Sequence, residues 1–523
     1  MVTLAIRTEL FEHGLFPTQG KLTPTVLLNL FTNLNLLSSI DYKIKLHQWV
    51  DQATRYWPQC TETDAQVYFL TYRALLEDIE NQSSSSVGGG VNQMQQNIAS
   101  GKDVPINEYQ VDVRCFALFI AIQLYTTQTK FNSESRSNLE KDSWGMKDNQ
   151  MYGGSQASPR QKYTKVNYTQ SEYQIISHFI KTNLKLLLRV ISTDIHSTEV
   201  SLSATEFNTL RILFRIQQQG GARTATQQSL AQVTQFFQAS NQQVKVHMNV
   251  IIDWLGQIIS PHEPEEEIVY MNGLNKCVTV KENALQNKDV RIIGCEDSYI
   301  YIDTNVSYLQ ISNCTNCTIM VAAVNKTLTI DKCENVILSV AANYVRAGNC
   351  VDCTVNTYTQ MCQPIIYGDS RNLTMAPHNT SYFEMMNHLR AADIGFVSPG
   401  QQVSNSIKQT VMENIHNFSK PIVMSGLGQC YILMQPVDFM KLSLPKKFTD
   451  HPLFLCPQEY QDVLQIRLEH FKEIQSKIKG AQLTQEQEKY LHAAIQGQFR
   501  EWFVQSSSYK PITELVRMID QEF

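Results

Sequence analysis

The segment "GNCVDCTVN" (residues 348–356) repeats a pattern that occurs earlier in "SNCTNCTIM" (residues 312–320). One template recurs in five segments: GCEDSYI (294–300), NCTNCTI (313–319), KCENVIL (332–338), NCVDCTV (349–355) and DSRNLTM (369–375). Its second position holds Cys295, Cys314, Cys333, Cys350 and Ser370, at spacings of 19, 19, 17 and 20 residues. A period of this length is typical of a solenoid of short stacked strands.

The fourth position of the template is always aspartate or asparagine: Asp297, Asn316, Asn335, Asp352 and Asn372. These residue types tolerate the left-handed backbone of a tight corner, and their stacked side chains can hydrogen-bond between turns. Apolar residues lie five positions before the Cys column (Val290, Leu309, Leu328, Val345, Ile365) and five after it (Ile300, Ile319, Leu338, Val355, Met375). This alternation predicts a parallel β-helix of roughly five turns whose inner face is buried.

The two Cys-x-x-Cys pairs imitate the spacing of a zinc or redox site. Their second cysteines are Cys317 and Cys353, and the equivalent residues in other turns are Ser298, Val336 and Leu373. A metal ligand is not interchangeable with valine or leucine, so we expect buried thiols that act as small hydrophobic side chains. Zinc-dependent structure is the alternative, and metal analysis of the purified protein tests it.

Three regions are expected along the 523 residues. Residues 1–260 should form a mostly α-helical N-terminal region with low-complexity loops at 81–101, 127–165 and 217–229. Residues 268–402 should form the β-helix, after the prolyl and acidic segment "PHEPEEE" (261–267). Residues 403–523 should form a C-terminal region that ends in a helical hairpin. The segment 377–403 and the helices before 268 are candidates to cap the ends of the coil.

Helical periodicity is clearest in two segments. Residues 172–193 place apolar side chains at three- and four-residue steps: Tyr173, Ile176, Phe179, Ile180, Leu184, Leu187, Leu188 and Ile191. Residues 457–480 carry a second stripe: Tyr460, Leu464, Leu468, Phe471, Ile474 and Ile478. Thr484 and Gln487 then offer a capping box for the next helix, and a last short helix is expected from Pro511.

Composition limits the classes of partner. The net charge of -5 and the pI near 6.2 argue against a general nucleic-acid binder. The opening "MVTLAIRTELFEHGLFP" (1–17) contains Arg7, Glu9 and Glu12 and does not resemble a secretory signal. The longest apolar run, "FALFIAIQLY" (116–125), is half the length of a bilayer span. We therefore expect a cytoplasmic protein with no membrane insertion, no nucleic-acid partner, no bound metal and no cofactor.

The coil with Cys and Asn corners, followed by "QPIIYGDSRNLTMAPHNTSYFEMM" (363–386), resembles the C-CAP/cofactor C-like domain of tubulin-binding cofactor C and its relatives. The flanking segments "LHQWVDQATRYWPQC" (46–60) and "LTQEQEKYLHAAIQGQFREWF" (483–503) are similar to those of a larger member of this family, over nearly the whole chain. The resemblance implies a central right-handed parallel β-helix between α-helical regions.

The resemblance also points to Arg346. In cofactor C and its retinal relative, a Gln-Gln-Leu/Phe-Arg motif supplies an arginine finger that promotes GTP hydrolysis on a partner GTPase. The matching turn here reads Asn343-Tyr344-Val345-Arg346, so both glutamines are absent, and the basic or His position two residues after the arginine is Gly348. The arginine stands where the motif places it.

The strand alternation predicts the direction of the Arg346 side chain. Val345 and Ala347 fall in inward columns, so Arg346 should point out of the coil, in one column with Arg291, Gln310 and Thr329. An outward arginine on a rigid wall can neutralise charge on a transferred phosphate. The alternative is an ordinary solvated strand residue.

The family resemblance implies a non-enzymatic cytoskeletal scaffold. It implies a location at the centrosome, spindle pole or basal body, as part of a microtubule organising centre, with roles in centrosome positioning, Golgi organisation, cell shape and cilia. Tubulin and centrosomal proteins are the implied partners. The alternative function is a GTPase-activating protein for tubulin or an Arf-like GTPase, with Arg346 as its catalytic residue.

Overall fold

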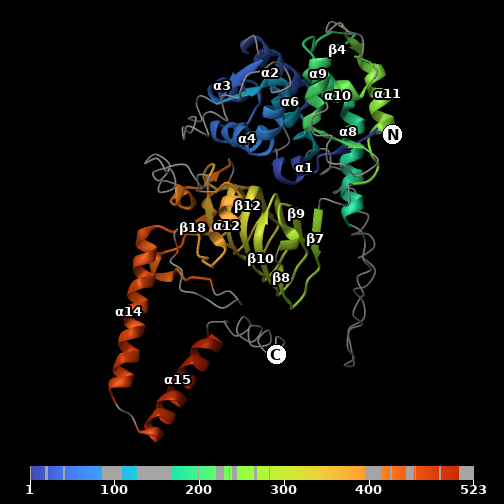
Figure 1. Ribbon diagram of the computed structural model, residues 1–523. Coiled ribbons are helices and arrows are strands. Elements are labelled where there is room, and N and C mark those ends of the chain that lie inside the picture. The colour runs from blue at the N-terminus through green and yellow to red at the C-terminus, as the bar shows by residue number, and fades with distance from the viewer. Residues whose placement is uncertain are drawn as a thin grey trace, which may run out of the picture. The chain divides into compact units, whose positions relative to one another are not determined.

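The structure is a computed structural model (Figure 1). It describes residues 2–17, 22–38, 42–84, 109–126, 168–197, 199–218, 229–234, 236–237, 244–263, 268–281, 283–394, 414–424, 427–442, 453, 455–481 and 484–505. The chain divides into two compact units, Met1–Glu267 with Val423–Gly426, and Ile268–Ile422 with Leu427–Phe523. The low-complexity loop predicted at 127–165, most of those at 81–101 and 217–229, and the helix predicted from Pro511 lie outside the described residues.

The first unit is mainly helical, which confirms the prediction for the N-terminal region. Among the described residues, its helices of four or more residues are α1 (Glu9–Gly14), α2 (Pro24–Leu37), α3 (Leu46–Tyr56), α4 (Glu62–Ser84), α6 (Val113–Ala121), α8 (Tyr168–Ile191), α9 (Ala204–Asn208), α10 (Leu230–Val233) and α11 (Met248–Ile258). All eight apolar side chains predicted for the buried face of α8 are buried. Helix α6 contains part of the long apolar run and lies in the core, where its residues 115–121 are buried.

Short antiparallel strand pairs also occur in this unit, and the sequence did not indicate them. They are β1 (Val2–Ile6) with β5 (Phe214–Gln218), β2 (Lys43–Lys45) with β3 (Gln110–Asp112), and β4 (Ser201–Leu202) with β6 (Val246–His247). A strand of two to five residues is too short to show a clear alternation, and its partner is far away in the sequence.

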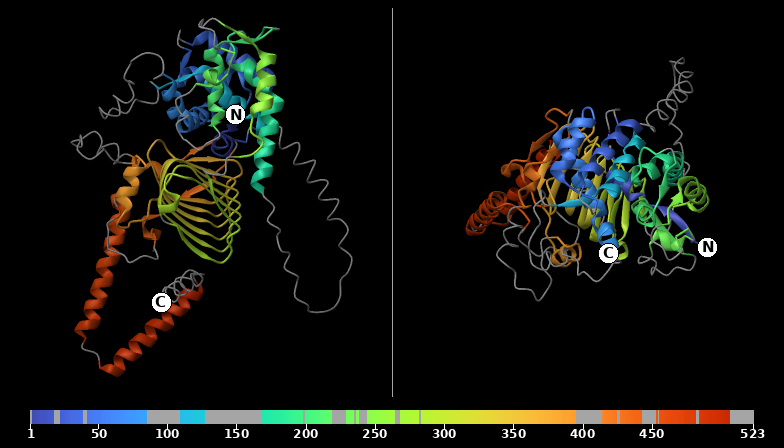
Figure 2. Two further views of the ribbon diagram at one scale, coloured as in Figure 1. Left: turned by 45° about the vertical axis from the view of Figure 1, so that its right-hand side comes forward. Right: turned by 90° about the horizontal axis from the view of Figure 1, so that it is seen from above.

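The second unit contains the predicted parallel β-helix (Figure 2). Its strands are β7 (Ile268–Asn272), β8 (Val278–Lys281), β9 (Asp289–Ile293), β10 (Tyr299–Val306), β11 (Leu309–Ser312), β12 (Thr318–Asp331), β13 (Ile337–Gly348), β14 (Thr354–Thr359), β15 (Ile365–Tyr367), β16 (Leu373–Pro377), β17 (Ile422–Val423) and β18 (Tyr431–Leu433). The first wall stacks β7, β9, β11 and the second halves of β12 and β13, then β15. The second wall stacks β8, β10 and the first halves of β12 and β13, then β14, β16 and β18.

The third side of the coil is one bridge residue wide in each turn: Asn275, Glu296, Thr315, Glu334, Val351 and Arg371. In the part of the coil that the structure describes, these six residues mark six turns, one more than the repeated template indicated. The additional turn is the first one. Its corner residues are Gly273, Leu274 and Lys276, so it lacks the Cys and Asn signature that identified the others.

Left-handed residues form both corners beside this narrow side. The predicted corner is confirmed: Asp297, Asn316, Asn335, Asp352 and Asn372 have φ angles of 49° to 54°. Their amides form the expected bonds between turns, with Asn335 Nδ2 donating to Asn316 Oδ1 at 2.8 Å and Asn316 Nδ2 donating to Asp297 Oδ1 at 3.1 Å. The other corner was not predicted, and its left-handed residues precede the Cys column: Gly273, Gly294, Asn313, Lys332, Asn349 and Gly368.

The segments after the last wide turn pack onto the coil. Helix α12 (Met385–Ala391) contacts β10 and β12 of the second wall, and its Met385 and Leu389 join an apolar cluster with Ala341 and Tyr358. The described part of 377–403 therefore covers a wall instead of capping an end, which corrects the prediction for this segment. The prediction of helices in the C-terminal segment is confirmed by α14 (Gln458–Gly480) and α15 (Gln485–Gln505), with Gln487 N donating to Thr484 Oγ1.

Candidate functional site

The first wall of the coil places Arg346 in the predicted column. Strand β13 pairs Arg346 with Thr329 of β12, and β11 continues the column through Gln310 to Arg291 of β9. The neighbouring residues Val345 and Ala347 are buried in the inward columns, as predicted. Alternation along the strand therefore directs Arg346 to the outside of the wall.

The last turn departs from the predicted register by one residue. Ile365 of β15 pairs with Arg346, not with Val345, and Tyr367 pairs with Gly348. The corner that follows β15 contains one residue more than the corner after β13, because Ser370 still lies beside Cys350. The prediction that Ile365 belongs to the inward column is therefore wrong, and the shift brings Tyr367 to the outer face next to Arg346.

Tyr367 occupies the space that a larger side chain at position 348 would fill. A Cβ atom added to Gly348 would overlap the Tyr367 ring. The guanidinium carbon of Arg346 lies 4.9 Å from the centre of the same ring, a cation–π arrangement. The glycine that replaces the motif's basic position thus provides the surface on which the tyrosine packs.

Asp331 completes this cluster at the edge of the wall. Its Oδ1 accepts hydrogen bonds from Asn349 Nδ2 at 2.7 Å and from the Tyr367 hydroxyl at 3.4 Å. Burial raises the pKa of the Asp331 carboxyl, although the Asn349 hydrogen bond and the nearby Lys332 act in the opposite direction. Burial, followed by the Asp331 charge, holds the pKa of Tyr367 well above its usual range, so its hydroxyl remains a donor.

The interpretation of Arg346 as a solvated strand residue is wrong, because the residue is 0% exposed. The structure brings it together with Tyr367, which sequence reasoning missed. The only signal for Tyr367 was an aromatic residue at a strand end, which does not reveal the one-residue shift in register.

The two motif positions that hold glutamine in the family have structural roles here. Asn343 Nδ2 donates to the carbonyl oxygen of Ala392, at 3.1 Å, and to that of Asn325, so its amide connects β13 to the end of α12. Tyr344 is fully buried. The Asn343 amide is therefore engaged with backbone carbonyl oxygens, and Tyr344 has no side-chain amide.

The column cysteines fill the interior of the coil, as predicted. Cys295, Cys314, Cys333 and Cys350 are all buried. All four thiols donate to the carbonyl oxygen two residues earlier, at 3.7 Å for Cys295, 3.4 Å for Cys314, 3.4 Å for Cys333 and 3.0 Å for Cys350. Ser370 repeats this role, since its hydroxyl donates to the Tyr367 carbonyl.

The second cysteines are also interior residues, and Cys317 and Cys353 are buried beside Val336. Burial raises the pKa of Cys317 to about 11, as for a thiol that packs as an interior side chain. No three His, Cys, Asp or Glu side chains are grouped to hold a metal ion within the described ranges.

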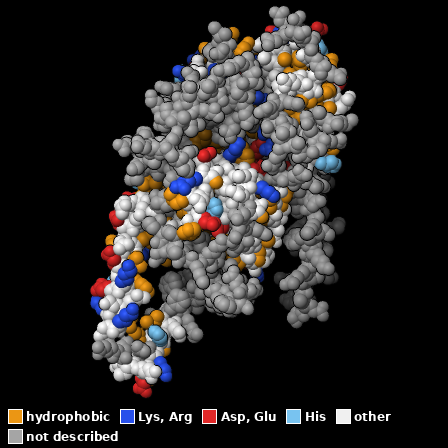
Figure 3. Space-filling view, in the orientation of Figure 1, with side chains coloured by type: hydrophobic (Ala, Val, Ile, Leu, Met, Phe, Trp, Pro, Cys, Tyr) orange, Lys and Arg blue, Asp and Glu red, His pale blue; other side chains and the backbone are white. Residues whose placement is uncertain are grey.

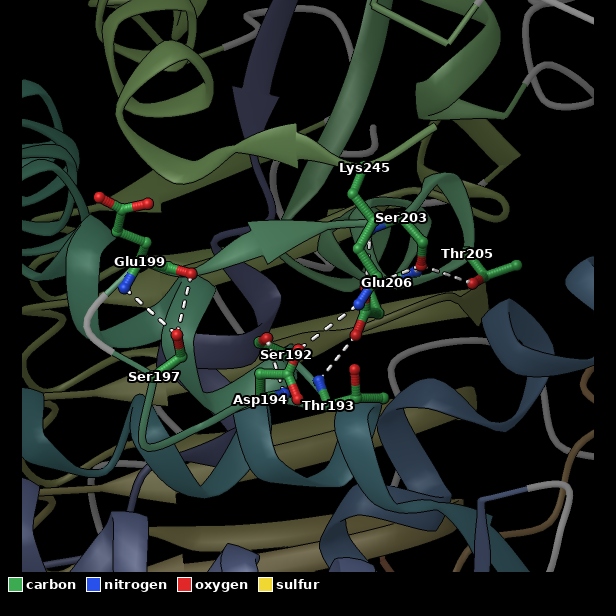
Figure 4. Close-up of polar contacts among 9 residues, drawn as sticks. All are labelled: Ser192, Thr193, Asp194, Ser197, Glu199, Ser203, Thr205, Glu206 and Lys245. Atoms are coloured by element: carbon green, nitrogen blue, oxygen red, sulfur yellow. Dashed lines mark hydrogen bonds and ion pairs between the residues drawn. The ribbon is translucent and has the colours of Figure 1, made fainter. Parts of the chain in front are cut away.

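A polar cluster in the helical unit is a helix-capping structure (Figure 4). The buried Glu206 carboxylate accepts hydrogen bonds from the Thr193 N–H, the Ser203 N–H and the Ser203 hydroxyl, each at 2.7 Å. Ser203 is the N-cap of α9, so the carboxylate joins the start of α9 to the end of α8. Both carboxylate oxygens are used in capping, which leaves Glu206 in a structural role.

Comparison with known proteins identifies the coil. Residues 287–405 match the family described as "Tubulin binding cofactor C". The chain is similar to "TBCC domain-containing protein 1" of Danio rerio, at 22% identity over 48% of this chain and 42% of that protein. It is similar to the proteins of the same name from Xenopus tropicalis, at 25% identity over 49% of this chain and 44% of the relative, and from Homo sapiens, at 22% over 48% and 43%.

These matches cover about half of this chain, less than the nearly complete resemblance that the flanking segments suggested. They also span less than half the length of the relatives, at 42% to 44%. The parallel coil, its buried Cys column and the matched residues 287–405 agree with one another. Residues 287–405 are therefore similar to the tubulin binding cofactor C family, and about half of the chain is similar to proteins named "TBCC domain-containing protein 1".

Proposed function

We propose that the protein is a non-enzymatic cytoskeletal scaffold whose coil and helical regions bind other proteins. The observation that supports this proposal is the environment of Arg346, together with the residues at the two positions that hold glutamine in the family. Arg346 is fully buried against the Tyr367 ring, and Asn343 and Tyr344 replace the two glutamines. A catalytic arginine needs neighbours that aim it at the reacting group, and this turn uses its polar groups for packing.

The proposed partners are tubulin and centrosomal proteins, and the proposed location is the cytoplasm and cytoskeleton, at the centrosome, spindle pole or basal body. Roles in centrosome positioning, Golgi organisation, cell shape and cilia belong to the same proposal. Similarity to the tubulin binding cofactor C family supports a partner of the tubulin type. None of the described helices has the length and apolar character needed to span a membrane.

Proximity labelling in cells tests the scaffold. The full chain and a variant that lacks residues 268–402 are compared under equal expression. We expect the full chain to label tubulin and centrosomal proteins, and the variant to lose those neighbours that bind the coil. Identical neighbours for both proteins would assign recruitment to the helical regions, and the absence of cytoskeletal neighbours would contradict the proposal.

The second candidate function is a GTPase-activating protein for tubulin or an Arf-like GTPase that uses Arg346. The observation that favours it is the register, which places Arg346 on the outside of a rigid wall at the motif position. Single-turnover GTP hydrolysis by each GTPase is measured alone, with the protein, and with Arg346→Ala. Arg291→Ala is the matched control, because Arg291 lies in the same column and its guanidinium packs 5.1 Å from the Tyr270 ring.

The scaffold predicts equal hydrolysis rates in all four samples. An arginine finger increases the rate of GTP hydrolysis by roughly 10³–10⁵-fold. If Arg346 acts in this way, the stimulation would be absent with Arg346→Ala and retained with Arg291→Ala. That result would establish the second function and would contradict the non-enzymatic one.

A further inference from the structure

Among the described residues, the contacts of helix α14 with its unit lie along its first half. Tyr460 is buried there, with ring-centre distances of 5.8 Å to Phe418 and 5.1 Å to Phe439. Leu464 packs on the same cluster. Arg467 Nη1 donates to the Phe439 carbonyl oxygen at 2.7 Å. Beyond this residue the helix continues to Gly480.

The apolar stripe of α14 continues into the second half. Leu468, Phe471 and Ile474 are 41%, 56% and 45% exposed, and Ile478 is half-buried. These four residues, called the α14 stripe, follow Tyr460 and Leu464 at steps of three and four residues and therefore lie on the face that packs on the unit upstream. Helix α15 diverges from α14 after their turn (Figure 2). An exposed apolar stripe that continues an existing packing surface indicates a binding face.

Basic side chains border the α14 stripe on both sides. Helical geometry places Lys472 and Lys479 along one margin and His470 and Lys477 along the other. The acidic Glu473 lies further from the stripe, where it pairs with Lys477 at 2.7 Å. Figure 3 shows Lys and Arg side chains beside apolar ones on the projecting helix.

We propose that the α14 stripe is the docking site for an amphipathic helix of a partner protein, with acidic residues on both sides of its apolar face. Two such helices bury apolar faces of similar width, and the flanking acidic residues meet the lysines of α14, as in a coiled coil. The α14 stripe is separate from the walls of the coil. A negative binding result for the stripe would therefore not contradict the function proposed for the coil.

Charge argues against two other occupants. In a second copy of α14 the same lysines would face one another across the stripe, which is unfavourable. An anionic membrane usually requires a cluster of about 4–8 free basic residues. The lysines that border the stripe are Lys472, Lys477 and Lys479, and Arg467 binds a carbonyl oxygen, so the cluster is smaller than a membrane requires.

The test uses the full chain and two synthetic helical peptides of about three heptads with leucine at the a and d positions. One carries glutamate at the flanking e and g positions, and the other carries lysine. We expect fluorescence anisotropy to show saturable binding of the glutamate peptide and binding of the lysine peptide at least ~10-fold weaker, a difference of ~1.4 kcal/mol. Charge reversal by Lys472→Glu with Lys479→Glu should weaken binding of the glutamate peptide and strengthen that of the lysine peptide.

Phe471→Glu with Ile474→Glu should abolish binding of the glutamate peptide. Ile466→Glu is the matched control, because Ile466 is 63% exposed on the same helix but outside the stripe, and its change should leave the affinity unaltered. Circular dichroism checks that both variants retain their helix content.

Several outcomes would overturn the proposal. Equal affinity for both peptides would remove the role of charge. Lack of binding of the glutamate peptide by the full chain would show that the stripe is not a docking site for an acidic helix. A dimer in sedimentation that Phe471→Glu dissociates would assign the stripe to a second copy. Binding to phosphatidylserine vesicles without peptide binding would assign it to a membrane.

Discussion

At the scale of single residues, Gly348 controls the environment of Arg346. The Tyr367 ring lies over Gly348 and contacts the guanidinium at the same time. A methyl group at position 348 would displace the ring from both contacts. We therefore expect Gly348→Ala to lower the free energy of unfolding of the coil unit by about 1–3 kcal/mol, the usual cost of overpacking.

Urea unfolding of the full chain measures this change. Gly428→Ala is the control, because a Cβ atom at Gly428 in the same unit would meet no atom within 4 Å. Its stability should stay within about 0.5 kcal/mol of the original protein. A Gly348→Ala variant as stable as this control would show that the ring can move at no cost.

At the scale of the turn, corner residues combine a backbone conformation with a bond between turns. Asn335 has a φ of 51° and donates to Asn316 Oδ1. Asn335→Ala loses the hydrogen bond and places a Cβ residue without a polar side chain in the left-handed region, at a combined cost of about 2–3 kcal/mol. Asn335→Gly loses only the bond and should cost about 1 kcal/mol.

The difference between the two substitutions isolates the conformational part, and thermal or urea unfolding measures it. Equal destabilisation by alanine and glycine would mean that the left-handed backbone is not what selects Asn and Asp at this corner. The same comparison at Asn316, whose φ is 54°, should give the same order.

At the scale of the whole molecule, the two units have buried groups that titrate in different pH ranges. In the helical unit, burial raises the pKa of Glu9, but the Arg215 and Arg7 guanidiniums outweigh this effect and lower it from 4.5 to about 2. Arg215 Nη2 and Arg7 Nη1 lie 2.8 Å and 3.2 Å from Glu9 Oε1. In the coil unit, burial lowers the pKa of His378 from 6.5 to about 3.

In both cases the unfolded chain binds the proton at a higher pH than the folded chain. The His378 contribution therefore reduces the stability of the coil unit as the pH falls from 6.5 towards 3, with a slope of up to ~1.4 kcal/mol per pH unit. The Glu9 contribution reduces the stability of the helical unit only below pH 4.5. On acidification the coil unit should be affected first.

Urea unfolding at a series of pH values tests this order, with circular dichroism as the signal. His378→Asn should flatten the pH dependence between pH 6.5 and 5, and Glu9→Gln should leave that range unchanged and flatten the dependence below pH 4.5. A His378→Asn variant with the original slope would show that the buried imidazole is not the group responsible.

The sequence by itself determined the coil. A period near 19 residues, an Asn or Asp corner and a Cys column are local features, and each turn repeats the same environment, so the pattern of Cys314, Cys333 and Cys350 predicted their burial. The outward column of Arg346 followed from the same alternation. The first turn was not predicted because Leu274 and Lys276 stand where the other turns have Cys or Ser and Asn or Asp. The second left-handed corner was not predicted because its position holds glycine, asparagine or lysine in different turns and so forms no uniform column.

Only the tertiary structure decided what surrounds Arg346. One extra residue at the corner after β15 changes which face of the strand Tyr367 occupies. Successive side chains of a strand point to opposite faces, so a shift of one residue moves each side chain to the other face. The role of Asn343 depends on the carbonyl oxygen of Ala392, 49 residues away in the sequence. Burial of a charged group depends on what packs over it, and that is set by contacts between distant segments, not by the local pattern of the strand.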